Sequence, residues 1–325
     1  MGMEPTINEN DFRQQRLQNM EGLKALGHEP FGRAFDRTGT LKEIRAGFEE
    51  ARVVKAAGRI LSIREMGKSV FADIADGSDR FQVYLRKNDL GEESFQAVKL
   101  LDLGDHIGVE GHLFTTRMGE QSLHAASWTL LSKALLPLPE KWHGLQDTDT
   151  RYRKRYLDLV ANPATLTRFR QRSEIVRELR AYLQGEGFIE VETPMMQAMA
   201  GGAAATPFKT HYEALSCDMY LRIAPELYLK RLLVGGLDRV FELNRNFRNE
   251  GLSRFHNPEF TMVEIYQAYG DCRSMMALVQ GMICHAARTV MGTLAVGFEG
   301  QPVQLDGAWR EVPYDDLIRE TAGAD

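Results

Sequence analysis

The run 241–271 constrains the fold of this chain more than any other stretch. It reads FELNRNFRNEGLSRFHNPEFTMVEIYQAYGD. An extended apolar segment, 241–247, ends in Arg248, a polar loop follows, and a second extended segment covers 259–269. Two extended segments joined by a charged loop predict an antiparallel β-hairpin.

Groups suited to a nucleoside triphosphate gather around this loop. Glu250, Arg254 and His256 lie within it, between Arg248 and Phe260. A planar cation binds phosphate, a carboxylate accepts from an exocyclic amine, and a ring stacks on a base. The alternative for Arg248 and Glu250 is a surface ion pair in a hairpin turn, which leaves the rest of the run unexplained.

Two acidic residues and a tyrosine are candidates for a binding pocket. Glu226 lies in an otherwise apolar stretch, APELYLK, where a carboxylate is costly to bury unless it is paired. A structural partner such as Arg222 or Arg231 is one interpretation, and a bound cation is the other. Glu264 and Tyr266 share one face of the second strand, since side chains alternate with period two.

Composition bounds the class of protein. The 325 residues are enough for two domains of about 100–200 residues each, and 43% hydrophobic with 26% charged residues is ordinary for a globular protein. The net charge of −5 means that any nucleic-acid contact must use a local patch. Cys217, Cys272 and Cys284 form no zinc-type spacing, and no apolar run reaches the ~18 residues of a membrane span. We expect a cytoplasmic protein without membrane contact.

The first half predicts a barrel behind a helical lead. Residues 1–50 are expected to form an N-terminal helical extension. Strands are predicted at 53–66, 68–76, 80–86, 105–117 and 121–131, and a helix at 92–101. Five strands with a helix between the third and fourth is the order of an OB-fold barrel, here 51–136. Such barrels stack single-stranded bases on exposed rings, so Phe71 is a candidate contact; a place in the barrel core is its alternative.

The second half predicts a separate α+β domain. Two prolines in LLPLPEKW mark the boundary, and 137–162 is expected to be a linker. Asn162 suits an N-cap and Pro163 a first helical position, so a long helix is predicted from there. A short strand, GFIEVETP, ends at Pro194, and Gly201 and Gly202 permit close approach of the backbone to a ligand.

Two stretches carry a family resemblance, RIAPELYLKRLLVGG at 222–236 and FRNEG…HNPEFTMVEIYQAY at 247–269. The FRxE element resembles motif 2 of the class II aminoacyl-tRNA synthetases, and the flanking residues resemble the lysine-specific members. GFIEVETP resembles motif 1, which forms the dimer interface in that family. The resemblance covers roughly 8–318 and departs at Thr206 and Glu213. It implies that ATP, lysine and lysine tRNA give charged tRNA, AMP and pyrophosphate, in a homodimer.

The resemblance also gives each candidate residue a role. Arg248 is expected to be catalytic, bridging the lysine carboxylate and the α-phosphate of ATP. The expected ATP contacts are Arg248, Glu250, His256, Asn257 and Phe260. The expected lysine contacts are Gly202, Glu226, Glu264 and Tyr266. The expected anticodon contacts are Arg64, Phe71, Gln82 and Glu120, and Pro194 is expected at the dimer interface.

The third family motif, GxGxDR, has no counterpart in this sequence. The resemblance therefore implies an incomplete catalytic domain at 163–325, with motifs 1 and 2 only. The acidic ligands of Mg²⁺ are expected beyond residue 325, and we expect the chain alone to form little lysyl-adenylate. Three alternatives remain: a tRNA-binding module without catalysis, an aspartyl- or asparaginyl-type ligase, and a paralogue that lysylates a protein.

Overall fold

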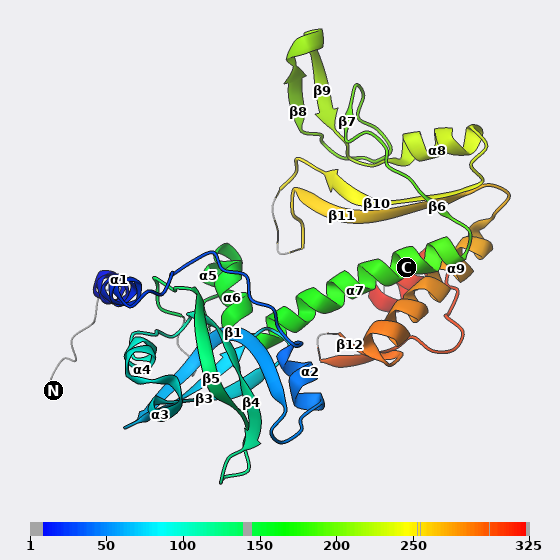
Figure 1. Ribbon diagram of the computed structural model, residues 1–325. Coiled ribbons are helices and arrows are strands. Elements are labelled where there is room, and N and C mark those ends of the chain that lie inside the picture. Colours follow the sequence, from blue (N-terminus) through cyan, green and yellow to red (C-terminus); the bar gives the residue numbers. More distant parts are fainter. Residues whose placement is uncertain (1–8, 139–144, 252, 254, 299, 323–325) are drawn as a thin grey trace, which may run out of the picture. The chain divides into compact units, whose positions relative to one another are not determined.

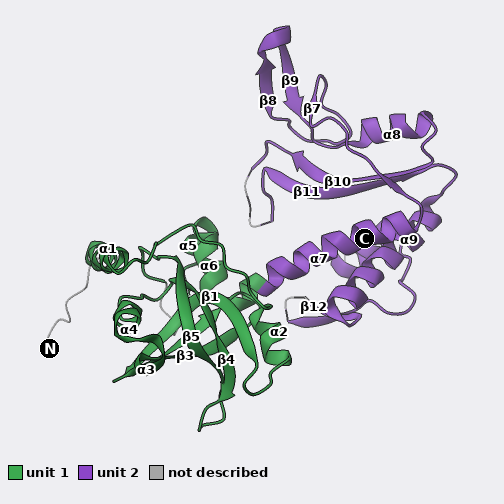
Figure 2. Cartoon of the chain, viewed as in Figure 1, with its two compact units in different colours: residues 1–166 green, residues 167–325 purple. Residues whose placement is uncertain are grey.

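The computed structural model describes residues 9–138, 145–251, 253, 255–298 and 300–322. Arg254 and part of the expected linker, 139–144, lie outside the described residues. The chain divides into two compact units, Met1–Leu166 and Thr167–Asp325 (Figure 2). Of the helices in the described part of the chain, none has the length and apolar character needed to cross a bilayer.

Unit 1 is built around a closed barrel with the strand order β1-β2-β3-β5-β4 (Figure 1). The strands are β1 (Val53–Met66), β2 (Ser69–Ala75), β3 (Arg80–Arg86), β4 (His106–Thr115) and β5 (Gln121–Ser132). The helices α3 (Lys87–Leu90) and α4 (Glu92–Val98) lie between the third and fourth strands. This confirms the order expected of an OB-fold, because each predicted strand has its counterpart within about two residues.

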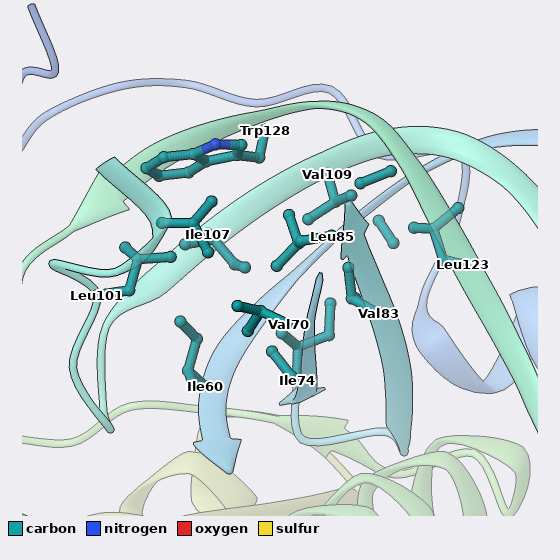
Figure 3. Close-up of a cluster of buried hydrophobic side chains, with 14 of the residues drawn as sticks. Ile60, Val70, Ile74, Val83, Leu85, Leu101, Ile107, Val109, Leu123 and Trp128 are labelled. Atoms are coloured by element: carbon teal, nitrogen blue, oxygen red, sulfur yellow. The ribbon is translucent and has the colours of Figure 1, made fainter. Parts of the chain in front are cut away.

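The barrel encloses one apolar core. Side chains alternate between the two faces of a strand, so every second residue points inward. Ile74, Val83, Leu85 and Leu123 are fully buried, and Figure 3 shows their side chains converging from different strands. Burial of this surface stabilises the unit by roughly 25 cal/mol per Å² of apolar area.

Helices precede and follow the barrel strands in unit 1, and those that precede them pack on its core. The N-terminal helices are α1 (Glu9–Ala25) and α2 (Leu41–Ala46), and Leu23 and Leu41 join the barrel core. The expected linker is not without structure, since it contains α5 (Thr148–Arg153) and α6 (Arg155–Ala161). Buried Asp158 accepts a hydrogen bond from Arg151 Nε at 2.9 Å and pairs with Arg155. Charged contacts rather than an apolar stripe therefore hold these helices, which is why the hydrophobic pattern did not predict them.

Unit 2 contains the predicted hairpin, β10 (Arg239–Phe247) and β11 (Glu259–Gln267), with the short β6 (Ile189–Glu190) parallel to β10. A second sheet has the order β7-β9-β8, and β12 pairs with β13. These strands are β7 (Met196–Gln197), β8 (Lys209–Tyr212), β9 (Cys217–Leu221), β12 (Ala295–Phe298) and β13 (Gln301–Gln304). The helical elements are α7 (Pro163–Gly185), η1 (Glu213–Leu215), α8 (Glu226–Val234), α9 (Cys272–Ala286), η2 (Ala287–Met291) and α10 (Tyr314–Ala322).

One face of the hairpin packs against helices. Phe241, Val263 and Ile265 contact Leu183 of α7 and Leu278 of α9 in a second apolar cluster. Figure 1 shows α7 and α9 on this side of β10 and β11, and α8 on the other side. The apolar face therefore fixes the hairpin and leaves its opposite face for other contacts.

Gly111 offers a test of barrel packing. An ideal Cβ at this position in β4 would lie 1.9 Å from the carbonyl oxygen of His124 in β5. We expect Gly111→Ala to lower the free energy of unfolding by about 1–3 kcal/mol or more, because overpacking displaces the two strands. Urea unfolding followed through the fluorescence of the core residue Trp128 measures this.

The matched control is Gly297→Ala in β12, where the added Cβ has no atom within 4 Å. This control should leave the barrel transition unchanged. Equal urea midpoints for Gly111→Ala and the unchanged chain would contradict the packing of β4 on β5.

Candidate functional site

The hairpin face opposite the helices is polar. Register pairs place Glu242 opposite Glu264 and Asn246 opposite Phe260. Because side chains alternate along each strand, one row of side chains shares this face: Glu242, Asn244, Asn246, Phe260, Met262, Glu264 and Tyr266. Arg248 continues the row past the end of β10, where its amide donates to the carbonyl of Pro258 at 2.9 Å. The period-two pattern thus brings the predicted arginine, carboxylate and rings to one surface.

Arg248 is half-buried rather than exposed to bulk solvent. Its guanidinium carbon lies 5.2 Å from the centroid of the Phe260 ring, a cation–π contact. Among the described residues no ion pair joins Arg248 to Glu250, so the surface ion pair considered above is not formed. The guanidinium is held by a ring and leaves its charge available to a ligand.

Three buried side-chain polar atoms in the described residues lack a hydrogen-bond partner: Arg222 Nη2, Asn246 Oδ1 and Arg248 Nε. Asn246 and Arg248 stand two residues apart on the polar face, and Arg222 contacts Glu242 on the same face. An unpaired buried polar atom costs about 1–3 kcal/mol. Their concentration at one surface indicates a place where a ligand completes the hydrogen bonding.

A buried ion pair lies beneath this surface. Arg222 Nη1 donates to Glu242 Oε1 at 2.6 Å, and both side chains are fully buried. Thr193 Oγ1 donates to the other oxygen of Glu242 at 2.6 Å, and Arg222 Nε donates to the carbonyl of Arg245 at 2.9 Å. The pair therefore joins three segments that are distant in the sequence.

Glu226 is not paired with either arginine considered in the sequence. Lys230, one turn along α8, lies 2.5 Å from its carboxylate, and the Glu226 side chain is 30% exposed. The alternative interpretation, with Arg222 or Arg231 as its structural partner, is therefore wrong: Arg222 pairs with Glu242 and Glu226 with Lys230. Gly202 lies beside Glu226: at a φ of +90°, its ideal Cβ would be 3.0 Å from the Glu226 Cβ. The two expected contacts for the substrate amine thus lie together.

Glu264 and Tyr266 form a second acidic position. The Tyr266 hydroxyl donates to Glu264 Oε2 at 2.9 Å. Desolvation raises the pKa of Glu264; the Tyr266 hydrogen bond opposes this shift, and the negative charge of Glu226 adds to it. The pKa of Tyr266 is raised as well. Desolvation is the largest cause, its hydrogen bond to Glu264 is the second, and the negative charges of Glu264 and Glu226 add to the shift. Tyr266 and Glu264 are thus in direct contact, and Glu226, at the start of α8, is near enough for its charge to act on both.

The loop residues lie apart from this packed surface. Glu250, His256 and Asn257 are exposed, and His256 Nδ1 lies 2.7 Å from the hydroxyl of Ser253. Arg254, in the same loop, is outside the described residues. Their role at a nucleotide stays a prediction.

The barrel residues of unit 1 share an outer face. Val70 and Ala72 of β2 are buried in the core, so Phe71 between them points outward, and its core alternative is wrong. Arg64 is exposed opposite Phe71 in the register of β1 and β2. Gln82 of β3 accepts a hydrogen bond from Ser122 Oγ at 3.0 Å. Glu120 is exposed in the turn between β4 and β5.

Sequence reasoning missed Arg222 and Asn246 as parts of the site. Counting back by two from Arg248 along the strand would have placed Asn246, Asn244 and Glu242 on its face. No such signal identifies Arg222, because its partner lies 20 residues away. Pro194 is exposed between β6 and β7, and its place at a dimer interface stays a prediction.

Comparison with known proteins agrees with this geometry. The family model described as tRNA synthetases class II (D, K and N) matches residues 147–325, and that of an OB-fold nucleic acid binding domain matches 54–131. The lysine–tRNA ligase of Syntrophomonas wolfei is 50% identical over 324 residues, 99% of this chain and 66% of the relative. That of Carboxydothermus hydrogenoformans is 50% identical over 97% of this chain and 65% of the relative. The chain thus spans slightly less than two thirds of the length of these relatives.

Glu242→Gln tests the buried pair. Removing one charge leaves Arg222 uncompensated in the interior, and we expect the free energy of unfolding of unit 2 to fall by about 3–5 kcal/mol. The control is Glu259→Gln, which breaks an exposed pair with Arg245 on the same hairpin and should cost at most about 1 kcal/mol. Thermal and urea unfolding measure both; similar losses in the two variants would show that the pair is not a structural anchor.

Proposed function

The chain belongs to the class II tRNA synthetases (D, K and N), and from this premise we propose that its catalytic unit binds lysine and ATP for charging of lysine tRNA. The lysine carboxylate attacks the α-phosphorus of ATP, the bond to the leaving pyrophosphate breaks, and lysyl-adenylate forms. The 3′-terminal hydroxyl of the tRNA then attacks the carbonyl carbon and releases AMP. No general base is needed for the first step, since the carboxylate is already ionised.

The charge on the polar side of the hairpin carries this proposal. The charges of two other carboxylates, Glu226 and Glu242, act on Glu264. Of these three carboxylates, only Glu242 is neutralised by a buried partner, Arg222. Lys230 pairs with Glu226 from a side chain that is 57% exposed, and such surface pairs contribute little. Two carboxylates therefore remain for a substrate with two ammonium groups. An aspartate substrate would meet like charges, which favours lysine over the aspartyl- or asparaginyl-type alternative.

We assign the two ammonium groups by position. Glu226 and the carbonyl of Gly202 receive the α-ammonium, because they lie together at the start of α8. Glu264 and Tyr266 receive the ε-ammonium, and the ion pair compensates the desolvation that raises the pKa of Glu264. This arrangement selects a side chain with a terminal cation.

Arg248 is the proposed catalytic residue. Two anions, a carboxylate and a phosphate, must meet, and charge develops on the phosphorus in the transition state. A guanidinium offers a planar fork of donors that can contact both, and Phe260 supports that plane from one side. In this proposal Phe260 also meets the adenine ring, Glu250 accepts from its amine, and His256 and Asn257 meet the outer phosphates.

Magnesium, tRNA and a second subunit complete the proposal. Mg²⁺ is proposed to accompany ATP; among the described residues, no group of three or more His, Cys, Asp or Glu side chains is placed to hold a metal ion. Arg64, Phe71, Gln82 and Glu120 are proposed to contact the anticodon of the tRNA. A homodimer through the region around Pro194 and a place in the cytoplasm are likewise proposals; the three cysteines are unbridged.

A stable analogue of lysyl-adenylate, the lysyl sulfamoyl adenosine, tests the site without requiring turnover. We expect it to bind the chain, and Arg248→Lys to weaken binding by about 10- to 150-fold through loss of the planar donors, measured by isothermal titration. The control Arg245→Lys changes a neighbouring side chain on the opposite face and should bind as before. Equal binding of an aspartyl analogue would overturn the lysine assignment, leaving at most a nucleotide-binding module.

Glu264→Gln tests the second ammonium contact. We expect lysine binding to weaken by about 10- to 150-fold, since charge-assisted hydrogen bonds contribute about 1.5–3 kcal/mol. Norleucine, which lacks the ε-ammonium, should bind the original chain and this variant with similar, weaker affinity. Glu259→Gln is the control on the same strand; if Glu264→Gln kept its preference for lysine over norleucine, Glu264 would not contact the ε-ammonium.

The raised pKa of Glu264 also predicts how lysine affinity and the stability of the unchanged chain depend on pH. Lysine needs this carboxylate ionised, so its affinity should fall as the pH falls through the raised pKa and stay level above it. In the ligand-free protein, ionisation of Glu264 has the opposite effect, because it lowers the stability of the fold. Ionised Glu264 is disfavoured by folding, so its destabilising effect is fully present above the raised pKa. Glu264→Gln should therefore stabilise the free chain at neutral pH. It should also remove the pH dependence of lysine affinity and of stability that Glu264 causes.

A further inference from the structure

Five aromatic rings form a continuous cluster on the outer face of the barrel in unit 1. Phe71 and Tyr84 have ring centroids 4.7 Å apart, and Tyr84 lies 5.1 Å from His124. His124 lies 4.8 Å from His112 and 5.7 Å from Phe114. Only the first of these rings was singled out in the sequence, so the cluster extends well beyond it.

The cluster follows from strand register. Phe71 of β2 is opposite Tyr84 of β3, Tyr84 is opposite His124 of β5, and His124 is opposite His112 of β4. Arg64 of β1 is opposite Phe71 and ends the row. One crosswise row of side chains thus joins all five strands, and every ring in it is partly exposed. On the inner face the same strands place mostly aliphatic side chains, with Phe81 of β3 and Trp128 of β5 among them.

The row lies where such barrels take oligonucleotides. The face of strands 2 and 3, with the loops between strands 1 and 2 and between strands 4 and 5, is the usual binding surface. Phe71 lies two residues after the start of β2, and Phe114 lies one residue before the end of β4, so the row runs between these two loops. One base stacks on one ring face, whereas this row contains several rings and so has room for more than one base.

We propose that the row contains two stacking positions, one on Phe71 and Tyr84 and a second on His112 and His124. This inference rests on the proposed tRNA binding of the barrel and deepens it, because it assigns a second unpaired base to residues of β4 and β5. The Asp89 carboxylate of α3 lies 2.8 Å from His124 Nε2 and fixes the plane of that ring. Arg86 lies 3.9 Å from the same carboxylate. A ring held in this way can stack on any base, while Arg64 adds a positive charge for the backbone.

Photochemical crosslinking separates one stacking position from two. The probe is the anticodon stem-loop of lysine tRNA with 5-iodouridine at one loop position at a time, a base that crosslinks to a ring on which it stacks. We expect two neighbouring loop positions to crosslink to the full chain, one to Phe71 or Tyr84 and the other to His112 or His124, as identified by mass spectrometry. Crosslinks confined to Phe71 and Tyr84 would overturn the second position.

Variants give an independent measurement of affinity. We expect His124→Ala and His112→Ala each to weaken stem-loop binding by about 5- to 150-fold, the range found when a stacking ring is removed. His124→Phe keeps a ring and should bind nearly as the original chain does, whereas a purely structural role for the imidazole and Asp89 would make it as weak as His124→Ala. His211→Ala, in unit 2, is the control and should have no effect.

Two failures remain distinguishable. If the original chain binds no stem-loop, the proposed role of the barrel in tRNA binding fails together with this inference. If Phe71→Ala weakens binding while both histidine variants bind as the original does, the role of the barrel stands and the second stacking position is wrong. Circular dichroism of each variant reports folding, and His124→Phe provides the test should His124→Ala fail to fold.

Discussion

Arg222 and Glu242 form a buried ion pair on which the geometry of the whole site depends. The pair, with Thr193, joins the segment before α8 to β10 and to the chain after β6. The carbonyl of Arg222 also accepts from the amide of Phe247, next to Arg248. Two buried charges are stable only when their geometry and remaining hydrogen bonds are satisfied. The positions of Glu226, at the start of α8, and of Arg248, at the end of β10, are therefore set by one interaction.

The hairpin separates stability from function by its two faces. Phe241, Val263 and Ile265 pack against α7 and α9 and hold the strands in place. The alternate residues, among them Asn246 and Glu264, are then free to be polar, because they contribute little to that packing. This division explains how one short stretch of sequence can contain both an apolar core face and a charged face. It also places these polar side chains on a sheet rather than on loops, which suits the proposed role of the site in holding two anions in register.

The sequence predicts those parts of the fold that follow from local periodicity. The strands of the barrel and hairpin alternate with period two, and α7 begins at Pro163, so all were expected within a few residues. The helices α5 and α6 were not, because ion pairs around Asp158 hold them. In the site, the row that contains Arg248 follows from strand alternation. The pairing of Arg222 with Glu242, and of Glu242 with Thr193 across 49 residues, depends on the tertiary fold and has no local signal.

The unsatisfied groups of unit 2 fit a protein whose site is completed by its ligands. Arg222, Asn246 and Arg248 each keep a buried polar atom without a partner, and Glu264 is held at a raised pKa by desolvation. Each of these features lowers the stability of the free protein, and natural sequences retain such conflicts mainly at functional sites. A ligand with two ammonium groups and an anionic centre would satisfy the carboxylates and the guanidinium together. Such an arrangement would give selectivity, because a substrate that lacks one of these charges leaves a buried group unpaired.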